Sequence, residues 1–109
     1  MSDDSAPVTL DGYQHAAART INASLDDGQQ LLDAAAGLAE EAGEVLGLVR
    51  KHVMQARVLD RDALAEELGD ALWCLAIAAS SAGLTLGEVA ERNVAKLRAR
   101  HPRGFASGV

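Results

Sequence analysis

Four acidic residues recur at matching positions in two short segments, at a spacing that suits a divalent cation. The segments Leu38–Leu46 and Leu64–Leu72 both read L-A-E-E-x-G-acid-x-L. The acids three residues apart are Glu41 and Glu44 in the first segment and Glu67 and Asp70 in the second. Because three residues turn an α-helix by about 300°, each pair projects from one helix face. Two such helices packed together would gather four carboxylates, which is unfavourable without a cation and useful with one.

A single acid pair at this spacing is most often a solvated helix face. Three features favour a site here. The acids flank the apolar stripe of their own helix, the pattern recurs, and a glycine, Gly43 or Gly69, stands between the acids of each pair. Glycine inside a helix costs roughly 1 kcal/mol relative to alanine, so its use in both copies suggests that space beside the acids is needed.

An all-oxygen ligand set favours Mg²⁺, with Mn²⁺ as the second choice, over zinc. The alternative is a di-iron carboxylate bundle, which uses Glu-x-x-His motifs in addition to glutamates. None of the three histidines, His15, His52 and His101, is in register with an acid pair, so we rank Mg²⁺ above iron. Bound Mg²⁺ retains waters and usually contacts substrate phosphates.

The composition predicts one helical domain. The chain has 109 residues, 49% of them hydrophobic, with few aromatics and a formal net charge of −6. This charge argues against binding of a nucleic acid polymer, which needs a basic footprint. After Glu91 the chain has no acid but several cations, which either neutralise an anionic ligand or simply suit a helix C-terminus. A lone Cys74, no apolar signal segment and no membrane-length apolar run fit a cytoplasmic protein.

Periodicity and capping residues predict an all-α fold, a four-helix bundle. The helices are expected from after Thr9 to Asn22, from Gly28 to Val53 with Asp27 and Gln30 as capping pair, from Arg61 to Ala82 with Asp60 as N-cap, and from the capping box Thr85–Glu88 to Arg100. Residues 1–8 and 106–109 are expected to be tails around a single domain, 9–105. A helical chain this small often gains stability by oligomerising.

The apolar stripes of the two acid-bearing helices are expected to pack against each other. The stripes are Leu31, Leu38, Ala42, Val45 and Val49, and Leu64, Leu68, Ala71, Leu75 and Ala82. Glu41 and Glu67 lie about 60° from the centre of their stripes, and Glu44 and Asp70 about 120°. If the stripes meet, the acids line one edge of the joint.

Two motifs in this order resemble the MazG-like nucleoside triphosphate pyrophosphohydrolases. Glu40–Glu44 followed by Glu67–Asp70 resembles the family signature E-E-x-x-E…E-x-x-D, and Asn93–Phe105 resembles its ending N-x-x-K-L-x-x-R-x-P-x-G-F. Leu10–Gln14 resembles the opening helix. The resemblance covers roughly residues 9–105 and implies an all-α homodimer or homotetramer that hydrolyses (d)NTPs to NMP and pyrophosphate, plausibly in nucleotide-pool house-cleaning.

The resemblance also implies roles for individual residues. By position, the catalytic Mg²⁺ ligands would be Glu41, Glu44, Glu67 and Asp70. One of these acids, or Glu40, would activate water; Glu40 has the weakest support because many similar sequences have glycine there. The substrate-binding residues would be Asn93 and Lys96, and with less support Arg100 and Lys51. A non-catalytic helical partner protein that senses a metal or a nucleotide is the alternative function.

Three other residues admit two interpretations each, and a fourth, Cys74, has one. Trp73 is interpreted as an oligomer contact, ahead of a base-stacking platform, because the helix around it is apolar on every face. Tyr13 and Gln14 either meet a nucleotide base or serve ordinary helix packing. Cys74 is most simply a small core residue.

Overall fold

Four helices make up the computed structural model, which describes residues 8–104. They are α1 (Leu10–Ala18), α2 (Asp27–Met54), α3 (Arg61–Ser81) and α4 (Leu86–Arg100). The predicted all-α class is confirmed, and each helix lies close to its predicted range. Residues 1–7 and 105–109, which include most of the predicted tails, lie outside the described residues.

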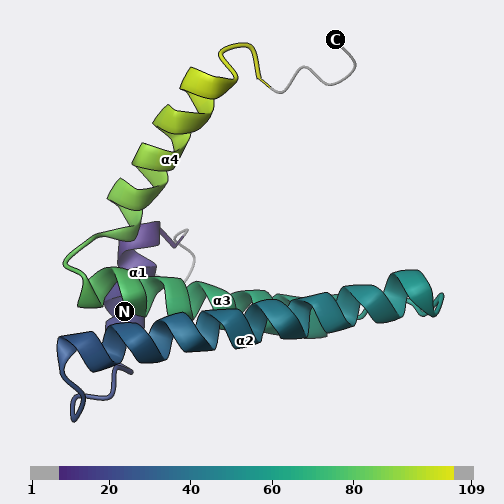
Figure 1. The fold of residues 1–109 in the computed structure, drawn as a ribbon, viewed down its shortest axis with the longest axis horizontal. Coiled ribbons are helices and arrows are strands. Elements are labelled where there is room, and N and C mark those ends of the chain that lie inside the picture. Colours follow the sequence, from purple (N-terminus) through teal and green to yellow (C-terminus); the bar gives the residue numbers. More distant parts are fainter. Residues whose placement is uncertain (1–7, 105–109) are drawn as a thin grey trace, which may run out of the picture.

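The long helices α2 and α3 form an antiparallel hairpin and lie side by side along the longest axis of the molecule (Figure 1). The loop between them turns at Ala56, which has a positive φ of 52°. Asp60 caps α3 as predicted, because its side chain accepts a hydrogen bond from the Ala63 N–H at 3.0 Å. The hairpin therefore brings the two acidic segments onto neighbouring helices.

Two helix ends differ from the prediction. The capping pair of α2 is Asp26 with Gln29, one residue before the predicted pair, because Asp26 is the residue with extended backbone. Helix α1 ends at Ala18 and not at Asn22. There the Thr20 hydroxyl bonds to the Ala17 carbonyl, and the Asn22 side chain accepts bonds from Ser24, so local side-chain bonds replace the next helical turn. The capping box at Thr85 and Glu88 is confirmed.

The contact between α2 and α3 lies closer to the acids than the predicted stripes do. Leu38, Val45, Leu64 and Ala71 are half-buried, as expected, but the other six stripe residues are exposed: Leu31, Ala42, Val49, Leu68, Leu75 and Ala82. The helices are thus rotated about their axes relative to the predicted packing, and small residues in the contact explain this rotation. Ala34 is buried, and a Cβ on Gly37 would lie only 3.0 Å from the Cys74 Sγ, so these positions let the helices approach closely.

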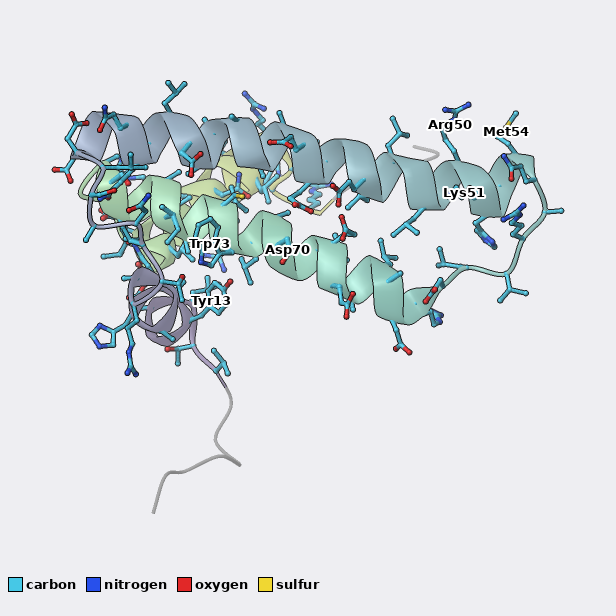
Figure 2. The ribbon with its side chains drawn as sticks, turned by 90° about the horizontal axis from the view of Figure 1, so that it is seen from below. Tyr13, Arg50, Lys51, Met54, Asp70 and Trp73 are labelled. Carbon is cyan, nitrogen blue, oxygen red and sulfur yellow. The ribbon has the colours of Figure 1, made fainter. Side chains whose placement is uncertain are left out.

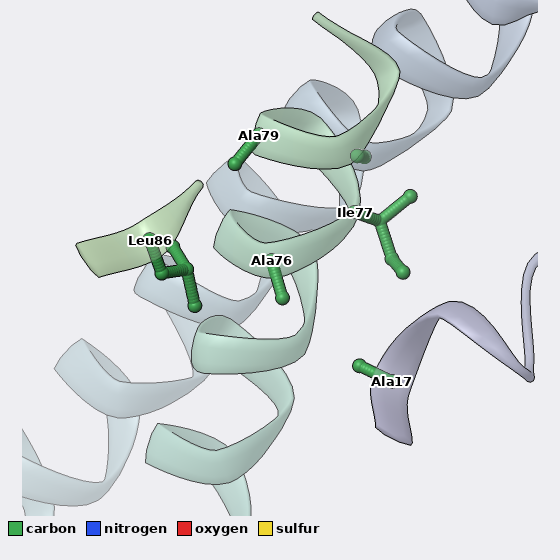
Figure 3. Packing of buried hydrophobic residues seen from close by; sticks show 6 residues of the cluster. Ala17, Ala76, Ile77, Ala79 and Leu86 are labelled. Carbon is green, nitrogen blue, oxygen red and sulfur yellow. The ribbon is translucent and has the colours of Figure 1, made fainter. Parts of the chain in front are cut away.

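The buried core is small and sits at one end of the hairpin, where α1 and the start of α4 pack on α3 (Figure 3). Its residues are Ala17, Ala34, Ala76, Ile77, Ala79 and Leu86. Half-buried Tyr13 and Trp73 pack against this cluster. At the other end of the hairpin, Val53, Met54 and Val58 are all more than 60% exposed.

Gln14 ties α1 to the turn between α3 and α4. Its amide nitrogen donates to the Ser80 Oγ at 3.0 Å and to the Leu84 carbonyl at 2.9 Å, while its Oε1 accepts from the Leu86 N–H at 2.7 Å. Asp11 accepts from the Gly87 N–H at 2.8 Å. The helix-packing interpretation of Gln14 is therefore the one that the structure supports, since all its polar atoms are occupied.

Helix α4 projects away from the hairpin. It lies at 102° to α3 and contacts α1 and α3 but not α2 (Figure 1). The Cα radius of gyration is 17.0 Å, whereas a compact chain of about 100 residues has a radius of roughly 13 Å. No single helix in residues 8–104 is long and apolar enough to cross a membrane, although the bent α3–α4 pair meets that length and composition when taken together.

Candidate metal and nucleotide site

Three of the four predicted acids meet between α2 and α3. One carboxylate oxygen from each of Glu41, Glu67 and Asp70 lies within 4.8 Å of the other two. Glu41 and Glu67 are half-buried and Asp70 is exposed, so the group opens to solvent at Asp70. The antiparallel hairpin produces this arrangement because it sets the two acidic segments opposite each other.

Two oxygens of this cluster are buried without a partner. Glu41 Oε2 and Glu67 Oε2 have no hydrogen-bond donor in the described chain. The pKa of Glu41 is raised above its ordinary value, first by desolvation, then by the close approach of the Glu67 carboxyl group and by the charges of Glu67, Asp70 and Glu40. Without a cation, the protein therefore favours a proton in this cluster.

Glu44 lies beside the cluster, in a neighbouring hollow. This hollow, of about 340 Å³, is lined by Glu44, Gly47, Leu48, Lys51, Ala63 and Glu67, and we call it the Lys51 hollow. Lys51 has no ion-pair partner among the described residues. Glu67 belongs to both the cluster and this hollow, so the two are continuous.

A second hollow lies on the other side of the cluster. This one, of about 240 Å³, is lined by Asp33, Gly37, Glu40, Glu41, Asp70, Trp73 and Cys74, and we call it the Trp73 hollow. The Trp73 indole donates to the Thr20 hydroxyl at 2.7 Å and packs on the core cluster, so its main contacts are within this chain. Figure 2 shows Trp73 close to Asp70 on α3, with Tyr13 of α1 beneath it. The oligomer contact expected for Trp73 stays a prediction.

The acids also act on the neighbouring Tyr13 and Cys74. Burial raises the pKa of the Tyr13 hydroxyl, and the charges of Asp70 and Cys74 raise it further. Burial likewise raises the pKa of the Cys74 thiol, with further contributions from Glu41, Asp70, Asp33 and Glu40. Both groups thus stay neutral at pH 7, and Cys74 is buried as predicted for a core residue.

The predicted residues of α4 are not brought to the acids within one chain. Asn93, Lys96 and Arg100 are exposed on a helix that has no contact with α2. Figure 1 shows α4 rising away from the hairpin from its α1 end. Of the predicted substrate-binding residues, only Lys51 lies near the acids in the described structure.

Asp33 was missed by the sequence reasoning. It stands seven residues before Glu40, which is two helical turns, and it lines the Trp73 hollow beside Glu40. The i, i+7 spacing places Asp33 and Glu40 on the same face of α2, and this pattern in the sequence could have indicated that they line one hollow. The bonds of Gln14 and Trp73 join residues more than fifty positions apart, and no local pattern indicates them.

The residues of the cluster fit a hard divalent cation. Three oxygen donors converge, the Oε2 atoms of Glu41 and Glu67 are buried without donors, and no histidine or cysteine is a member of the group in residues 8–104. Such a donor set suits Mg²⁺ or Mn²⁺ better than a softer metal.

The fold and the site together define a class: small all-α proteins with an acidic cluster between two antiparallel helices, flanked by hollows large enough for a phosphorylated small molecule. Comparison with known families makes this specific. The chain belongs to the family of the MazG nucleotide pyrophosphohydrolase domain, whose sequence model matches residues 29–105. The predicted family resemblance is therefore confirmed.

Among curated proteins, this chain is similar to the Gene 37 protein of Mycobacterium phage L5. The two are 37% identical over 76 residues, which cover 66% of this chain and 67% of the phage protein. That name states no activity. No solved structure gives a significant match to this chain.

Proposed function

We propose that the protein hydrolyses (deoxy)nucleoside triphosphates to nucleoside monophosphate and pyrophosphate in a Mg²⁺-dependent reaction. The observation that carries this proposal is the convergence of Glu41, Glu67 and Asp70 in a chain of the MazG family. Family membership supports the reaction class, and the cluster supplies donors for the ion that such a reaction needs.

In this proposal Glu41, Glu67 and Asp70 hold the metal, and Glu44 completes the set from the adjacent hollow. Mg²⁺, or Mn²⁺ in its place, supplies charge neutralisation for the phosphate oxygens when bound. The buried oxygens of Glu41 and Glu67 then gain a partner, which removes the cost of leaving them unpaired.

Lys51 binds a phosphate group in this scheme. Lys51 lines the hollow that Glu67 also lines, and it has no carboxylate partner in the described chain. A cation placed there attracts the oxygens of a triphosphate that enters beside the acids. The Trp73 hollow, on the other side of the cluster, is left for the nucleoside.

Glu40 is the group that we propose to accept the proton of the attacking water. It is exposed, lines the Trp73 hollow, and lies outside the three-carboxylate cluster. Water attacks the α-phosphorus, the bond from that phosphorus to the bridging oxygen breaks, pyrophosphate leaves, and one water proton passes to the carboxylate. We further propose that the enzyme acts on the cytoplasmic nucleotide pool in house-cleaning, which the reduced, buried Cys74 fits.

We also propose that the protein works as a homodimer or homotetramer. Several large apolar side chains stay exposed on the hairpin, among them Val53 at 66%, Leu46 at 58% and Leu68 at 52%. The core of one chain is small, and its radius of gyration is large for its length. A second copy would cover this apolar surface.

The test is pyrophosphate release by the pure protein with a panel of canonical and damaged (d)NTPs. We expect turnover with Mg²⁺ and none with EDTA. The Glu41→Gln variant should lose activity more than about 100-fold. Mutating a residue that only hydrogen-bonds to a metal ligand already lowers activity about 10–100-fold, and Glu41 is proposed to be a ligand itself. Circular dichroism of the variant should match the wild type.

Two other results would replace the proposal. Nucleotide binding without pyrophosphate release from any substrate would favour the non-catalytic sensor. Iron in the purified protein, together with no pyrophosphate release, would favour an oxygen-activating bundle.

A further inference from the structure

The Trp73 hollow offers a ligand many hydrogen-bond acceptors and hardly any donor. Its polar side chains are four carboxylates and a thiol, those of Asp33, Glu40, Glu41, Asp70 and Cys74. An ionised carboxylate only accepts hydrogen bonds, and a neutral thiol is a weak donor. The Trp73 indole N–H is already bonded to the Thr20 hydroxyl. The backbone N–H groups here belong to the interiors of α2 and α3 and are bonded along those helices.

Asp33 stands at the end of this hollow that is remote from the metal cluster. It precedes Glu41 by eight residues on α2, which separates the two residues by about 12 Å along the helix axis. On a wheel of 100° per residue, Asp33, Gly37 and Glu40 fall within about 60° of one another, so they follow one line along α2. The hollow therefore runs from the cluster, past Gly37, to Asp33.

The middle of the hollow is uncharged. Gly37 has no side chain, and the position of its missing Cβ lies only 3.0 Å from the Cys74 Sγ. Helix α3 runs antiparallel to α2, so Trp73 and Cys74, one turn after Asp70, lie between the cluster and Asp33. Figure 2 shows this order on α3, with Trp73 nearer than Asp70 to α1. Small and aromatic residues here suit the uncharged sugar and ring of a nucleoside.

The aromatic wall of the hollow is held in place by α1. The Trp73 indole donates to the Thr20 hydroxyl at 2.7 Å, and this hydroxyl donates in turn to the Ala17 carbonyl at 2.7 Å. Trp73 also packs against the buried core cluster. The wall is therefore formed before a ligand arrives, which reduces the entropy lost on binding a planar ring.

The Asp33 carboxylate has no structural task in the described chain. Among residues 8–104, nothing donates a hydrogen bond to Asp33 or forms an ion pair with it. It is not a member of the three-carboxylate cluster, and the N-cap of α2 is Asp26. Its side chain is exposed at the hollow and is thus available to a ligand that brings a hydrogen-bond donor.

We propose that Asp33 selects nucleotides whose base carries an amino group over those with a carbonyl oxygen at the same position, as cytosine over uracil. The inference rests on the proposed function, in which the phosphates lie at the cluster and the nucleoside enters the Trp73 hollow. The sugar then crosses Gly37 and Cys74, and the base reaches Asp33. An amino group donates to the carboxylate, which is the usual acidic contact to cytosine. A carbonyl oxygen there meets a second acceptor and no donor.

The first test measures binding without turnover. Analogues of dCTP and dUTP with NH in place of the α–β bridging oxygen are titrated with Mg²⁺ in a calorimeter. The dCTP analogue should bind about tenfold more tightly, as expected for one hydrogen bond to a charged group. Asp33→Asn, whose amide has both a donor and an acceptor, should abolish this difference. Asp27→Asn makes the same exchange at an exposed position of α2 outside the hollow and should preserve it.

The second test compares kcat/KM for dCTP with dUTP, and for dATP with dITP, which differ by the same exchange of amino group for carbonyl oxygen. We expect both ratios to be about ten or more in the wild type and to fall to within about twofold of one in Asp33→Asn. If no triphosphate is hydrolysed, the proposed reaction fails, and the binding preference still decides the role of Asp33.

Two results would overturn the inference. Equal affinity of the wild type for the two analogues, or tighter binding of the dUTP analogue, would show that Asp33 does not select an amino group. An equal loss for both members of each pair in Asp33→Asn would place its carboxylate against the sugar. Trp73, the one tryptophan of the chain, should change its fluorescence with the bound analogue, and an unchanged signal would place the base outside the Trp73 hollow.

Discussion

The carboxyl groups of Glu41 and Glu67 meet across the contact between α2 and α3, with the Oε2 atom of each buried and without a donor in the described residues. Two carboxylates so placed cannot both be ionised without a penalty. A proton or a cation relieves it. The stability of the protein and its proposed activity are therefore linked at this one contact.

The first prediction concerns stability against pH. The pKa of Glu41 is raised from its ordinary value of 4.5, first by desolvation and then by Glu67. The folded protein thus holds this proton more tightly than the unfolded chain does. The contribution to stability is greatest below pH 4.5 and is lost as the pH rises through the folded pKa.

Urea unfolding at several pH values with EDTA should reveal this loss, and Mg²⁺ should restore stability at neutral pH. In Glu41→Gln, the metal-free protein should melt higher than the wild type at pH 7 and should gain little from Mg²⁺. A variant that keeps the wild-type response to Mg²⁺ would argue against Glu41 as a ligand.

The second prediction separates the acid cluster from acids elsewhere on α3. Asp70→Asn should lower kcat/KM more than about 100-fold, because it removes a proposed direct metal ligand. Glu66→Gln removes the same kind of charge from an exposed position outside the cluster and both hollows, and it should change kcat/KM less than about threefold. Equal losses in the two variants would point to net charge and not to the cluster.

The third prediction tests Lys51 against its neighbour. Figure 2 shows Arg50 and Lys51 leaving α2 in different directions, and only Lys51 lines the hollow beside Glu67. Lys51→Ala should raise KM for the triphosphate at least about tenfold, which corresponds to the loss of one charged hydrogen bond. Arg50→Ala serves as the control and should leave KM unchanged within twofold. If Arg50→Ala had the larger effect, the phosphate would have to bind on the other face of α2.

The fourth prediction concerns the buried amide that holds α1 to the α3–α4 turn. Gln14→Ala breaks three hydrogen bonds and leaves the buried Leu86 N–H without its acceptor. We expect the free energy of unfolding to fall by about 2–3 kcal/mol in urea titrations. His15→Ala, at an exposed position next in the chain, should change it by less than about 0.5 kcal/mol. A loss that small in Gln14→Ala would mean that water replaces the amide.

The fifth prediction contrasts two glycines of α2. A Cβ at Gly43 would meet nothing within 4 Å, so Gly43→Ala should stabilise the helix by up to about 1 kcal/mol. A Cβ at Gly37 would lie 3.0 Å from the Cys74 Sγ, so Gly37→Ala should gain nothing or destabilise. In the Cys74→Ala background, Gly37→Ala should stabilise the protein, and a double-mutant cycle should measure this coupling between the two positions. If the effects of the two substitutions were simply additive, Gly37 would not be needed for the close approach of α2 and α3.

Gly43 and Gly69 are predicted to leave room beside the acids for a packed helix or a ligand. Both are exposed, and an added Cβ at either position would meet nothing within 4 Å in this chain, so what that space accommodates stays a prediction. The glycine that permits close helix packing is Gly37, which lies outside the repeated motif. Its role depends on Cys74, a residue 37 positions later, so no local pattern reveals it.

Local sequence determined the helices and the identity of the acids. Capping residues such as Asp60 and Thr85 act within one turn, and helical periodicity puts Glu67 and Asp70 on one face of α3, so these features could be read directly. The tertiary structure decided how α2 is rotated against α3, which set Glu44 beside the cluster and left Val49 and Leu68 exposed. It also decided that α4 points away from the acids of its own chain. Both outcomes depend on contacts between distant residues, such as Gly37 with Cys74 and Gln14 with Leu86, which periodicity within one helix does not encode.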